Sequence, residues 1–315
     1  FIATIRKKQL NLYRGFDMES NKKFTRRQFI RQATIASAGV LVLSQYSQAN
    51  VRSASEMVNL GQSGVKVSRL GIGTGTNSGH VQREIGQENF TSMIHHAFER
   101  GITFYDTADN YGEMHERLAV AIKSLDREKI QIQTKIPPGK FEKPLQEIDR
   151  YRREVGTDYF DSVLIHCVRT PDWIETFKKL RDELEEAKEK KWARSIGVSM
   201  HGLPPLNRTV ESDWGDVRLV RVNHNGTHMD NLRDQWNKAG NVDAVIAGIK
   251  KMHVEGKGII GMKLIGNGDF KDPQVRRKSI EFVMSLDCVD ASVIGFKSPS
   301  EIDEAIENIN RALQN

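Results

Sequence analysis

Four side chains that could share one proton-transfer site stand at or just after the ends of three apolar segments. Asp106 and Tyr111 follow the first segment, Lys135 ends the second and His166 ends the third. A tyrosine hydroxyl has an ordinary pKa of about 10, which makes it a weak proton donor at neutral pH. A neighbouring lysine ammonium would lower that pKa, and a carboxylate would hold the lysine in place. These residue types therefore predict a tyrosine general acid tuned by a Lys–Asp pair.

The chain that must position these residues alternates between apolar strand patterns and amphipathic helix patterns. We predict strands at residues 69–73, 102–106, 130–135, 162–166, 193–199, 218–223, 258–262 and 291–295. We predict helices at residues 88–100, 114–123, 144–155, 173–190, 205–210, 242–254, 273–286 and 299–313. Eight such repeats over about 245 residues match the ~250 residues of a (β/α)8 TIM barrel, an α/β fold.

The carboxyl ends of barrel strands meet on one rim, and that rim carries the active site in barrels of this kind. The predicted rim collects these polar residues: Asp106, Lys135, His166, Ser199 and His224. Residues 57–68 contain a Gly-rich turn between two short strand patterns and predict an N-terminal β-hairpin. No linker divides residues 50–315, so we predict one barrel domain.

The net charge of +6 is concentrated in the first 49 residues, which hold nine Lys/Arg and two Asp/Glu. The rest of the chain holds 38 basic and 39 acidic side chains. A nearly neutral body has no excess of basic charge that would indicate nucleic-acid binding, so we expect no nucleic-acid partner. The two cysteines, Cys167 and Cys288, are too few for a disulfide framework, and whether they pair stays open.

Residues 1–49 read as a leader. Arg26-Arg27 stand just before Phe29, the apolar residues 33–43 follow, and Ser47-Gln48-Ala49 is a small-x-small cleavage site. Arg26 and Arg27 in this setting resemble a twin-arginine export signal. The apolar segment is shorter than the ~20 residues that span a bilayer, so we expect no stable membrane span.

We therefore expect the twin-arginine export machinery to be a partner of the chain and the leader to be cleaved near Ala49. The mature protein would then be periplasmic or extracellular. Met18 opens a signal of ordinary length, so we expect residues 1–17 to lie outside the natural product.

Several short stretches occur in a fixed order at these predicted strand ends. They are residues 61–74, residues 104–108 with Tyr111-Gly112, residues 134–135, residues 156–161 before Ile165-His166, residues 196–199 and residues 293–295. Together they resemble the aldo-keto reductase family, from the hairpin to the last helix. The resemblance implies reduction of an aldehyde or ketone to an alcohol by hydride transfer from NAD(P)H. It also implies a small-molecule carbonyl substrate.

The resemblance assigns roles to the four residues named first. Tyr111 would donate a proton to the carbonyl oxygen, and Lys135 would lower the pKa of Tyr111. Asp106 would pair with Lys135, and His166 would orient and polarise the carbonyl. Taken singly, Asp106 could also cap a turn, and His166 could be a hydrogen-bonded core histidine.

The resemblance implies NADP as cofactor and leaves NAD open. The implied cofactor-binding residues are Gly73, Thr74, Asp106, Ser199, His224, Met262, Lys263, Gly266, Asn267, Gly268, Lys297, Ser298 and Glu304. Lys297 and Ser298 suit a 2′-phosphate. Glu301 stands where the family commonly has arginine and would repel that phosphate. Met200 stands where asparagine is usual.

Two other functions fit the same barrel. His166, His201 and His224 follow three consecutive strands and could bind a metal in a hydrolase or isomerase, although Lys135 would then face the metal. A non-catalytic binding subunit is the second alternative, because a fold does not imply a function. We expect no metal in the favoured interpretation. Substrate identity and oligomeric state are not determined by the sequence.

Overall fold

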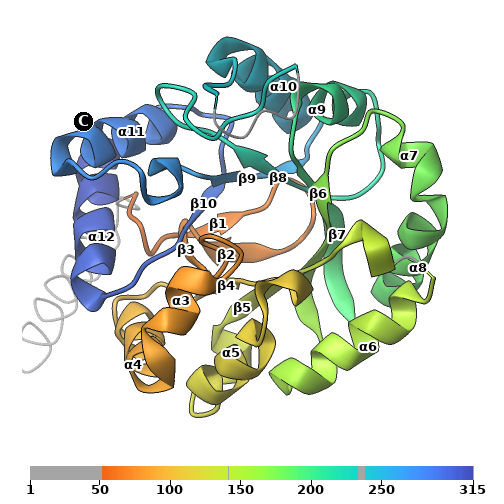
Figure 1. Cartoon of the computed structure of the whole chain (residues 1–315), viewed down its shortest axis with the longest axis horizontal. Coiled ribbons are helices and arrows are strands. Elements are labelled where there is room, and N and C mark those ends of the chain that lie inside the picture. The colour runs from red at the N-terminus through yellow and green to blue at the C-terminus, as the bar shows by residue number, and fades with distance from the viewer. Residues whose placement is uncertain (1–51, 141, 233–237, 315) are drawn as a thin grey trace, which may run out of the picture. The chain divides into compact units, whose positions relative to one another are not determined.

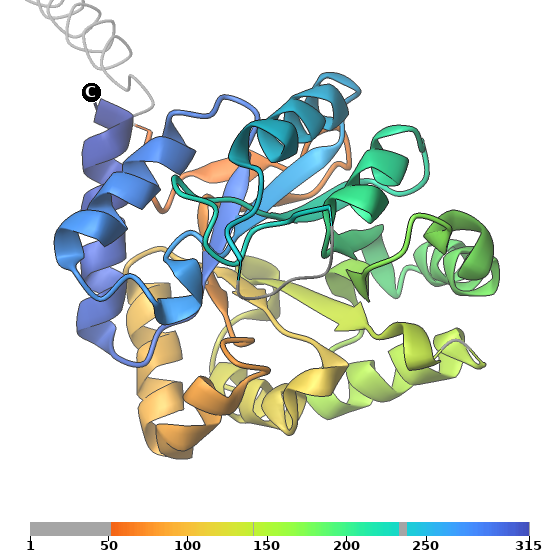
Figure 2. The same cartoon turned by 45° about the horizontal axis from the view of Figure 1, so that its top comes forward.

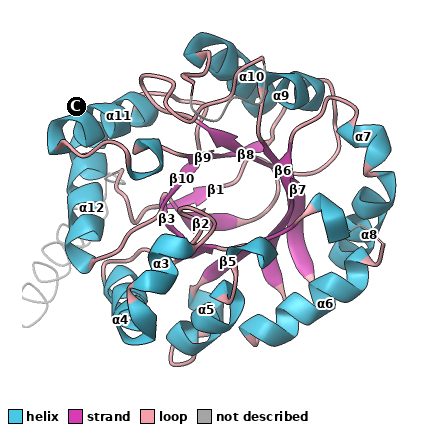
Figure 3. Ribbon diagram, viewed as in Figure 1, coloured by secondary structure: helices cyan, strands magenta, loops and turns pink. Residues whose placement is uncertain are grey.

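Eight parallel strands close into a barrel in this computed structural model, which describes residues 52–140, 142–232 and 238–314. The strands are β3 (Leu70–Gly73), β4 (Phe104–Asp106), β5 (Gln131–Ile136), β6 (Phe160–Val168), β7 (Ala193–Met200), β8 (Val217–Arg221), β9 (Gly258–Met262) and β10 (Ala291–Ile294). Neighbours around the barrel follow chain order, and β10 closes the ring by pairing with both β9 and β3 (Figure 3). The predicted barrel is confirmed. The predicted leader, residues 1–49, lies outside the described residues.

Helices connect successive strands and surround the barrel (Figure 1). They are α3 (His80–Glu84), α4 (Gly86–Glu99), α5 (Met114–Ile122), α6 (Pro144–Val155), α7 (Trp173–Thr176), α8 (Lys178–Glu189), α9 (Leu203–Val210), α10 (Val242–Val254), α11 (Pro273–Met284) and α12 (Pro299–Gln314). Short 3-10 turns are η1 (Asp109–Tyr111), η2 (Arg127–Lys129), η3 (Pro138–Lys140) and η4 (Gly266–Gly268). Ile302, Ile306 and Ile309 of α12 recur at helical spacing and are buried, as an inward apolar face requires.

An antiparallel hairpin closes one end of the barrel. It consists of β1 (Met57–Asn59) and β2 (Lys66–Ser68), which lie within the outline of the ring in Figure 1. Leu60, Val65 and Val67 of the hairpin region pack against the interior side chains of the barrel, including Phe104 at the start of β4. The hairpin therefore fills the amino-terminal end, and the carboxyl end remains for a site.

Alternation along each strand divides side chains between the barrel interior and the helix layer. In β8, Val217 and Leu219 belong to the interior cluster with the hairpin, whereas Val220 packs with the helices. The next interior position of β8 is Arg221, at the carboxyl end of the strand. Lys135 lies near the carboxyl end of β5 and is 1% exposed. The cluster against the hairpin is thus apolar, and buried charged side chains lie toward the carboxyl ends of the strands.

Three local predictions were incomplete. The helix predicted at residues 173–190 is broken at Phe177 into α7 and α8, and Trp173 of α7 packs edge-to-face on Trp214 with ring centroids 5.7 Å apart. Helix α3 was not predicted. Strand β6 continues past His166 through a bulge, with Cys167 at φ 54°.

Figure 2 turns the barrel so that the layer of helices outside the strands can be followed from another side. In the part of the chain that the structure describes, none of these helices combines the length and the apolar character needed to cross a membrane.

Candidate active site

Asp106, Tyr111, Lys135 and His166 meet at the carboxyl end of the barrel. Lys135 Nζ lies 2.7 Å from Asp106 Oδ1 and 3.4 Å from the Tyr111 hydroxyl. The Tyr111 hydroxyl lies 3.3 Å from His166 Nε2. Lys135 also donates to the carbonyl of Thr107 at 2.8 Å. The structure therefore brings together all four residues that the sequence singled out.

Burial dominates the pKa of Tyr111. Burial raises the pKa of Tyr111 well above its ordinary value, and the Asp106 carboxylate adds to the rise. Burial also lowers the pKa of Lys135, against the opposing effect of Asp106. The charge of Arg221 acts on the pKa of Tyr111 in the direction opposite to burial, and the expected lowering of the Tyr111 pKa by Lys135 stays a prediction. The phenol stays protonated at neutral pH, as a proton donor must.

His166 is held neutral. Burial lowers the pKa of His166 well below its ordinary value, and the charges of Lys135 and Lys263 act in the same direction. His201, with its ring centroid 6.4 Å from that of His166, also has a strongly lowered pKa, caused by burial and then by Arg221. Neither imidazole takes up a proton in the folded chain near neutral pH.

Because the pKa values of His166 and His201 are lowered, we expect the folded chain to lose stability in mild acid. Below about pH 6.5 the unfolded chain protonates both residues, while the folded chain does not, so the free energy of unfolding falls as the pH falls. Each histidine contributes a slope of up to ~1.4 kcal/mol per pH unit. We expect His201→Gln to reduce the slope between pH 6 and pH 5 by about that amount, measured by urea unfolding at each pH. If the free energy of unfolding has the same pH dependence in His201→Gln and wild type, the pKa of His201 is not lowered in the folded chain.

The turn that carries Tyr111 is fixed from two sides. Arg83 of α3 donates to the carbonyl oxygen of Tyr111 and, at 2.9 Å, to that of Ser78. The Tyr111 ring lies close against Gly75, after β3: a Cβ at Gly75 would come within 2.4 Å of Tyr111 Cζ and 2.6 Å of its hydroxyl oxygen. The hydroxyl thus keeps its position only if residue 75 has no side chain.

We expect Gly75→Ala to displace the Tyr111 ring and to lower kcat/KM by about 100-fold, since a misplacement of ~1 Å can cost that much. Stability should change little, because the ring can swing away. Gly139→Ala is the matched control, since a Cβ there meets nothing within 4 Å. Steady-state kinetics with a reducible aldehyde make the measurement. Full activity in Gly75→Ala would show that the hydroxyl position is not critical.

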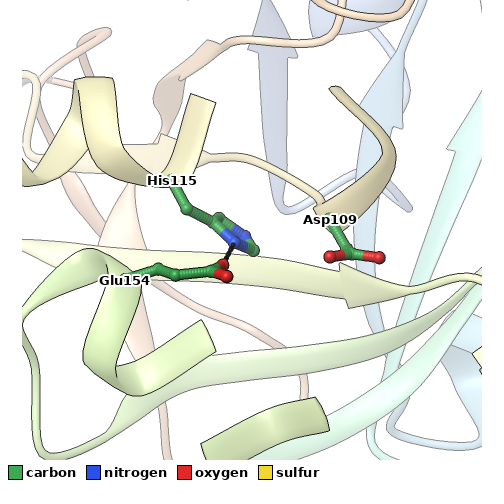
Figure 4. Close-up of side chains that lie close together, drawn as sticks. All are labelled: Asp109, His115 and Glu154. Atoms are coloured by element: carbon green, nitrogen blue, oxygen red, sulfur yellow. Dashed lines mark hydrogen bonds and ion pairs between the residues drawn. The ribbon is translucent and has the colours of Figure 1, made fainter. Parts of the chain in front are cut away.

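A polar network behind the turn includes a group of potential metal ligands. Asp109, His115 and Glu154 place one ligand atom each within 4.8 Å of one another (Figure 4). However, the Arg150 guanidinium donates to both Asp109 and Glu154. His115 uses both ring nitrogens, with Glu154 Oε2 at 2.9 Å and Thr134 Oγ1 at 2.8 Å. This network therefore connects the turn that carries Tyr111 to α6, and the Arg150 guanidinium supplies its positive charge.

The alternative metal site is not assembled. Among the described residues, His166, His201 and His224 do not form a group of converging ligand atoms. His201 Nδ1 contacts Arg221 and lies 2.9 Å from Cys167 Sγ, while the ring of His224 packs against Phe270.

Cys167 and Cys288 are both free thiols, so they do not pair with each other, a question that the sequence left open.

Two cavities form a groove that leads away from the tetrad. The smaller, about 80 Å³, is lined by Tyr111 and Asp106, and the larger, about 500 Å³, reaches the start of α12. Both are lined by Thr76, Ile265, Asn267, Gly268, Ile294 and Gly295. An Asn267–Asn77 hydrogen bond of 3.0 Å joins η4 to the loop after β3. The groove therefore runs from the phenol along the β9, β10 and β3 side of the rim.

Many of the predicted cofactor-binding residues line this groove. Those that do are Gly73, Asp106, Met262, Lys263, Asn267, Gly268, Lys297 and Glu304. Those that lie outside its lining are Thr74, Ser199, His224, Gly266 and Ser298. The buried hydroxyl of Ser199 has no hydrogen-bond partner, and the same holds for Thr74 Oγ1 and His224 Nδ1. The length of the groove fits a dinucleotide, whereas these unpartnered atoms lie outside its lining.

The far end of the groove carries charges of both signs. Arg276 of α11 makes two bonds of 2.7 Å to Glu304. The Glu301 carboxylate accepts the Lys297 backbone N–H at 2.9 Å. The Arg276 guanidinium, which would suit a 2′-phosphate, is thus already bonded to the Glu304 carboxylate. Arg276 was missed from the sequence, because nothing in its helix pattern distinguishes it from a surface arginine.

Arg221 was also missed, although the sequence contained a signal for it. The apolar residues Val217 and Leu219 alternate with it along β8, which makes Arg221 a charged side chain at an interior position. It is 3% exposed, and Arg221 Nη1 lies 3.6 Å from Asp230 Oδ1.

Residues 69–281 match the model of the aldo/keto reductase family, so the chain belongs to that family. A probable aldo-keto reductase of Glycine max is 36% identical over 180 residues, covering 50% of this chain and 51% of that protein. The chain matches about half the length of its curated relatives. A putative aldo-keto reductase structure from Pseudomonas aeruginosa has a TM-score of 0.67 at 21% identity, covering 84% of this chain and 100% of that one. An aldo/keto reductase from Klebsiella pneumoniae, in complex with NADP and acetate, has a TM-score of 0.59 at 16% identity, covering 82% and 90%.

Proposed function

We propose that the protein reduces an aldehyde or ketone to an alcohol with a reduced nicotinamide nucleotide. The observation that carries the proposal is the Tyr111 hydroxyl, which lies between Lys135 Nζ at 3.4 Å and His166 Nε2 at 3.3 Å. This arrangement belongs to a chain of the aldo/keto reductase family. A protonated phenol at the inner end of a long groove is suited to donate a proton to a carbonyl oxygen.

The side chains divide the work on the substrate. His166, neutral and 3.3 Å from the hydroxyl, orients the carbonyl oxygen toward Tyr111. The Tyr111 O–H bond breaks as the proton moves to that oxygen. A nicotinamide nucleotide held along the groove by residues such as Met262, Asn267 and Gly268 would supply the hydride for the carbonyl carbon. Lys135, fixed by Asp106 at 2.7 Å, stabilises the tyrosinate that forms. A proton from solvent then restores the phenol.

NADP is the proposed nucleotide, and NAD is the alternative. The Klebsiella pneumoniae relative with NADP in its structure supports NADP. Lys271 brings positive charge to the far end of the groove, where Arg276 is paired with Glu304 and Lys297 Nζ lies 3.8 Å from Glu301 Oε1. Glu301 and Glu304 line the same end of the groove, and their negative charge favours the 2′-hydroxyl of NAD over the 2′-phosphate of NADP. The preference between NADP and NAD therefore depends on how far neighbouring cations neutralise these two carboxylates.

Fluorescence titration with NADPH and NADH tests the proposal directly. We expect micromolar or tighter binding of at least one nucleotide and turnover of a simple aldehyde. Binding without turnover of any carbonyl compound would favour the non-catalytic subunit. If neither nucleotide binds, the reductase proposal fails.

We also propose that residues 1–49 direct export through the twin-arginine pathway, because Arg26-Arg27 stand before an apolar segment and a cleavage site. Replacing both arginines with lysine should keep the protein in the cytoplasm, as followed by fractionation and N-terminal sequencing. Unchanged export would contradict this proposal.

A further inference from the structure

One loop borders both the groove and the turn that carries the proton donor. This β3–α3 loop consists of residues 74–79, and its residues Thr76 and Asn77 line the larger cavity. Gly75 and Thr76 line the smaller cavity beside Tyr111. A molecule that fills the groove would therefore contact the β3–α3 loop as well as the proton donor.

The β3–α3 loop has an uncommon backbone conformation. Asn77, Ser78 and Gly79 have φ angles of 49°, 55° and 81°, in the left-handed region that residues with a side chain rarely occupy. Asn77 Oδ1 accepts a 3.0 Å bond from Asn267, which also lines the larger cavity, and the Ser78 carbonyl accepts a 2.9 Å bond from Arg83 Nη1. Because the left-handed conformation costs free energy, the loop keeps it only while such contacts hold it.

Arg83 joins the β3–α3 loop to the Tyr111 turn. Its Nη1 atom donates to the Ser78 carbonyl and also to the Tyr111 carbonyl, so one nitrogen bridges the two segments. Arg83 Nε also lies 3.7 Å from Glu113 Oε2, but this pair is partly exposed and an exposed ion pair contributes little. The two carbonyls are therefore the contacts through which Arg83 acts.

The loop and the turn are also packed directly against each other. A Cβ at Gly79 would come within 2.6 Å of the Tyr111 carbonyl oxygen and 3.0 Å of Tyr111 Cβ. A Cβ at Gly112 would come within 2.9 Å of Arg83 Nη1. The loop, the guanidinium and the turn thus leave no space for a methyl group, and a displacement of the loop is passed to the turn.

We propose that Arg83 is a positioning residue that couples the β3–α3 loop to Tyr111, so that a nucleotide bound in the groove also fixes the proton donor. The part of this inference that concerns the nucleotide rests on the proposed reductase function. A nucleotide that contacts Thr76 and Asn77 restricts their loop. The loop fixes the Ser78 carbonyl, and Arg83 then holds the Tyr111 carbonyl beside it. Because proton transfer depends on where the Tyr111 hydroxyl lies, the donor is placed for reaction when the groove is filled.

Hydrogen exchange of the full chain, followed by mass spectrometry, tests the coupling. In the wild type, we expect NADPH, or NADH if only NADH binds, to slow amide exchange by about fivefold or more in the β3–α3 loop and in residues 108–113. The second segment includes the Tyr111 N–H, which donates to the Ala108 carbonyl at 3.2 Å. In Arg83→Met the slowing should persist in the loop and be lost in residues 108–113. If the nucleotide protects residues 108–113 equally in Arg83→Met, it acts on the turn without Arg83, and the coupling is overturned.

Kinetics and nucleotide binding separate positioning from general stability. We expect Arg83→Met to lower kcat by about 10- to 100-fold, because a proton donor displaced by ~1 Å loses about that much, while the Kd for NADPH stays within about threefold. Arg83→Lys, which keeps one donor group, should recover part of kcat. Arg152→Met is the matched control: Arg152 also donates to a backbone carbonyl, that of Asp158 at 2.7 Å, but lies outside both cavities. An equal fall in kcat in Arg152→Met would overturn the specific role of Arg83.

Asn77→Ala tests the coupling without a nucleotide. It removes the bond to Asn267, so exchange should become faster in the β3–α3 loop and, through Arg83, in residues 108–113. In Arg83→Met/Asn77→Ala, exchange in residues 108–113 should be no faster than in Arg83→Met alone. If residues 108–113 do not respond to Asn77→Ala, the coupling is overturned. If this pattern is found but neither nucleotide binds, the reductase proposal fails and the coupling through Arg83 stands.

Discussion

Replacing Tyr111 with phenylalanine is expected to lower kcat for carbonyl reduction by about 10² to 10⁴-fold, the usual contribution of a positioned general acid. The variant removes the hydroxyl that contacts both Lys135 and His166 while leaving the ring that lines the small cavity. Nucleotide binding should therefore persist within about twofold. Single-turnover kinetics with saturating NADPH measure the chemical step without product release.

Tyr105→Phe is the matched control for this prediction. Tyr105 is fully buried on the helix side of β4, and its hydroxyl lies 3.4 Å from the Ile102 carbonyl oxygen, so the variant also loses one buried hydroxyl. It should cost about 1 kcal/mol of stability and leave the rate close to that of the wild type. If Tyr111→Phe keeps more than a tenth of the wild-type rate, the hydroxyl is not the proton donor.

Replacing Asp106 with alanine is expected to lower the free energy of unfolding by about 3 to 5 kcal/mol, because it leaves a buried ammonium without its carboxylate. Lys135 is 1% exposed and lies 2.7 Å from Asp106, so solvent cannot replace the lost partner. For a domain of this size the loss corresponds to a fall in Tm of roughly 6 to 20 °C. Calorimetry and urea unfolding make the measurement.

Asp106→Asn combined with Lys135→Met separates charge from packing. This double variant removes both buried charges, so it should recover most of the stability that Asp106→Ala loses and remain inactive. Lys178→Ala provides a surface comparison, because the Lys178–Asp182 pair is exposed and should be worth less than ~1 kcal/mol. Equal stability of Asp106→Ala and wild type would show that the pair does not hold the site together.

The fold could be predicted because its signals are local. Alternation of apolar residues over a few positions identifies a strand, and apolar residues three or four apart identify a helix. The predicted bounds of β9, α6 and α10 agree with the structure. The predictions failed where neighbouring parts of the chain decide the backbone, as at the bulge of Cys167 and the break at Phe177.

The sequence by itself also determined which residues could form the tetrad, because the carboxyl ends of parallel strands must meet on one rim. Only the tertiary structure decided how those residues behave. The pKa of Tyr111 rises because the barrel buries it, and the hydroxyl keeps its position because Gly75 lies against its ring. Arg221 faces the tetrad because β8 lies across the barrel from β4. Burial and contacts across the barrel depend on residues far apart in the chain, and no local pattern records them.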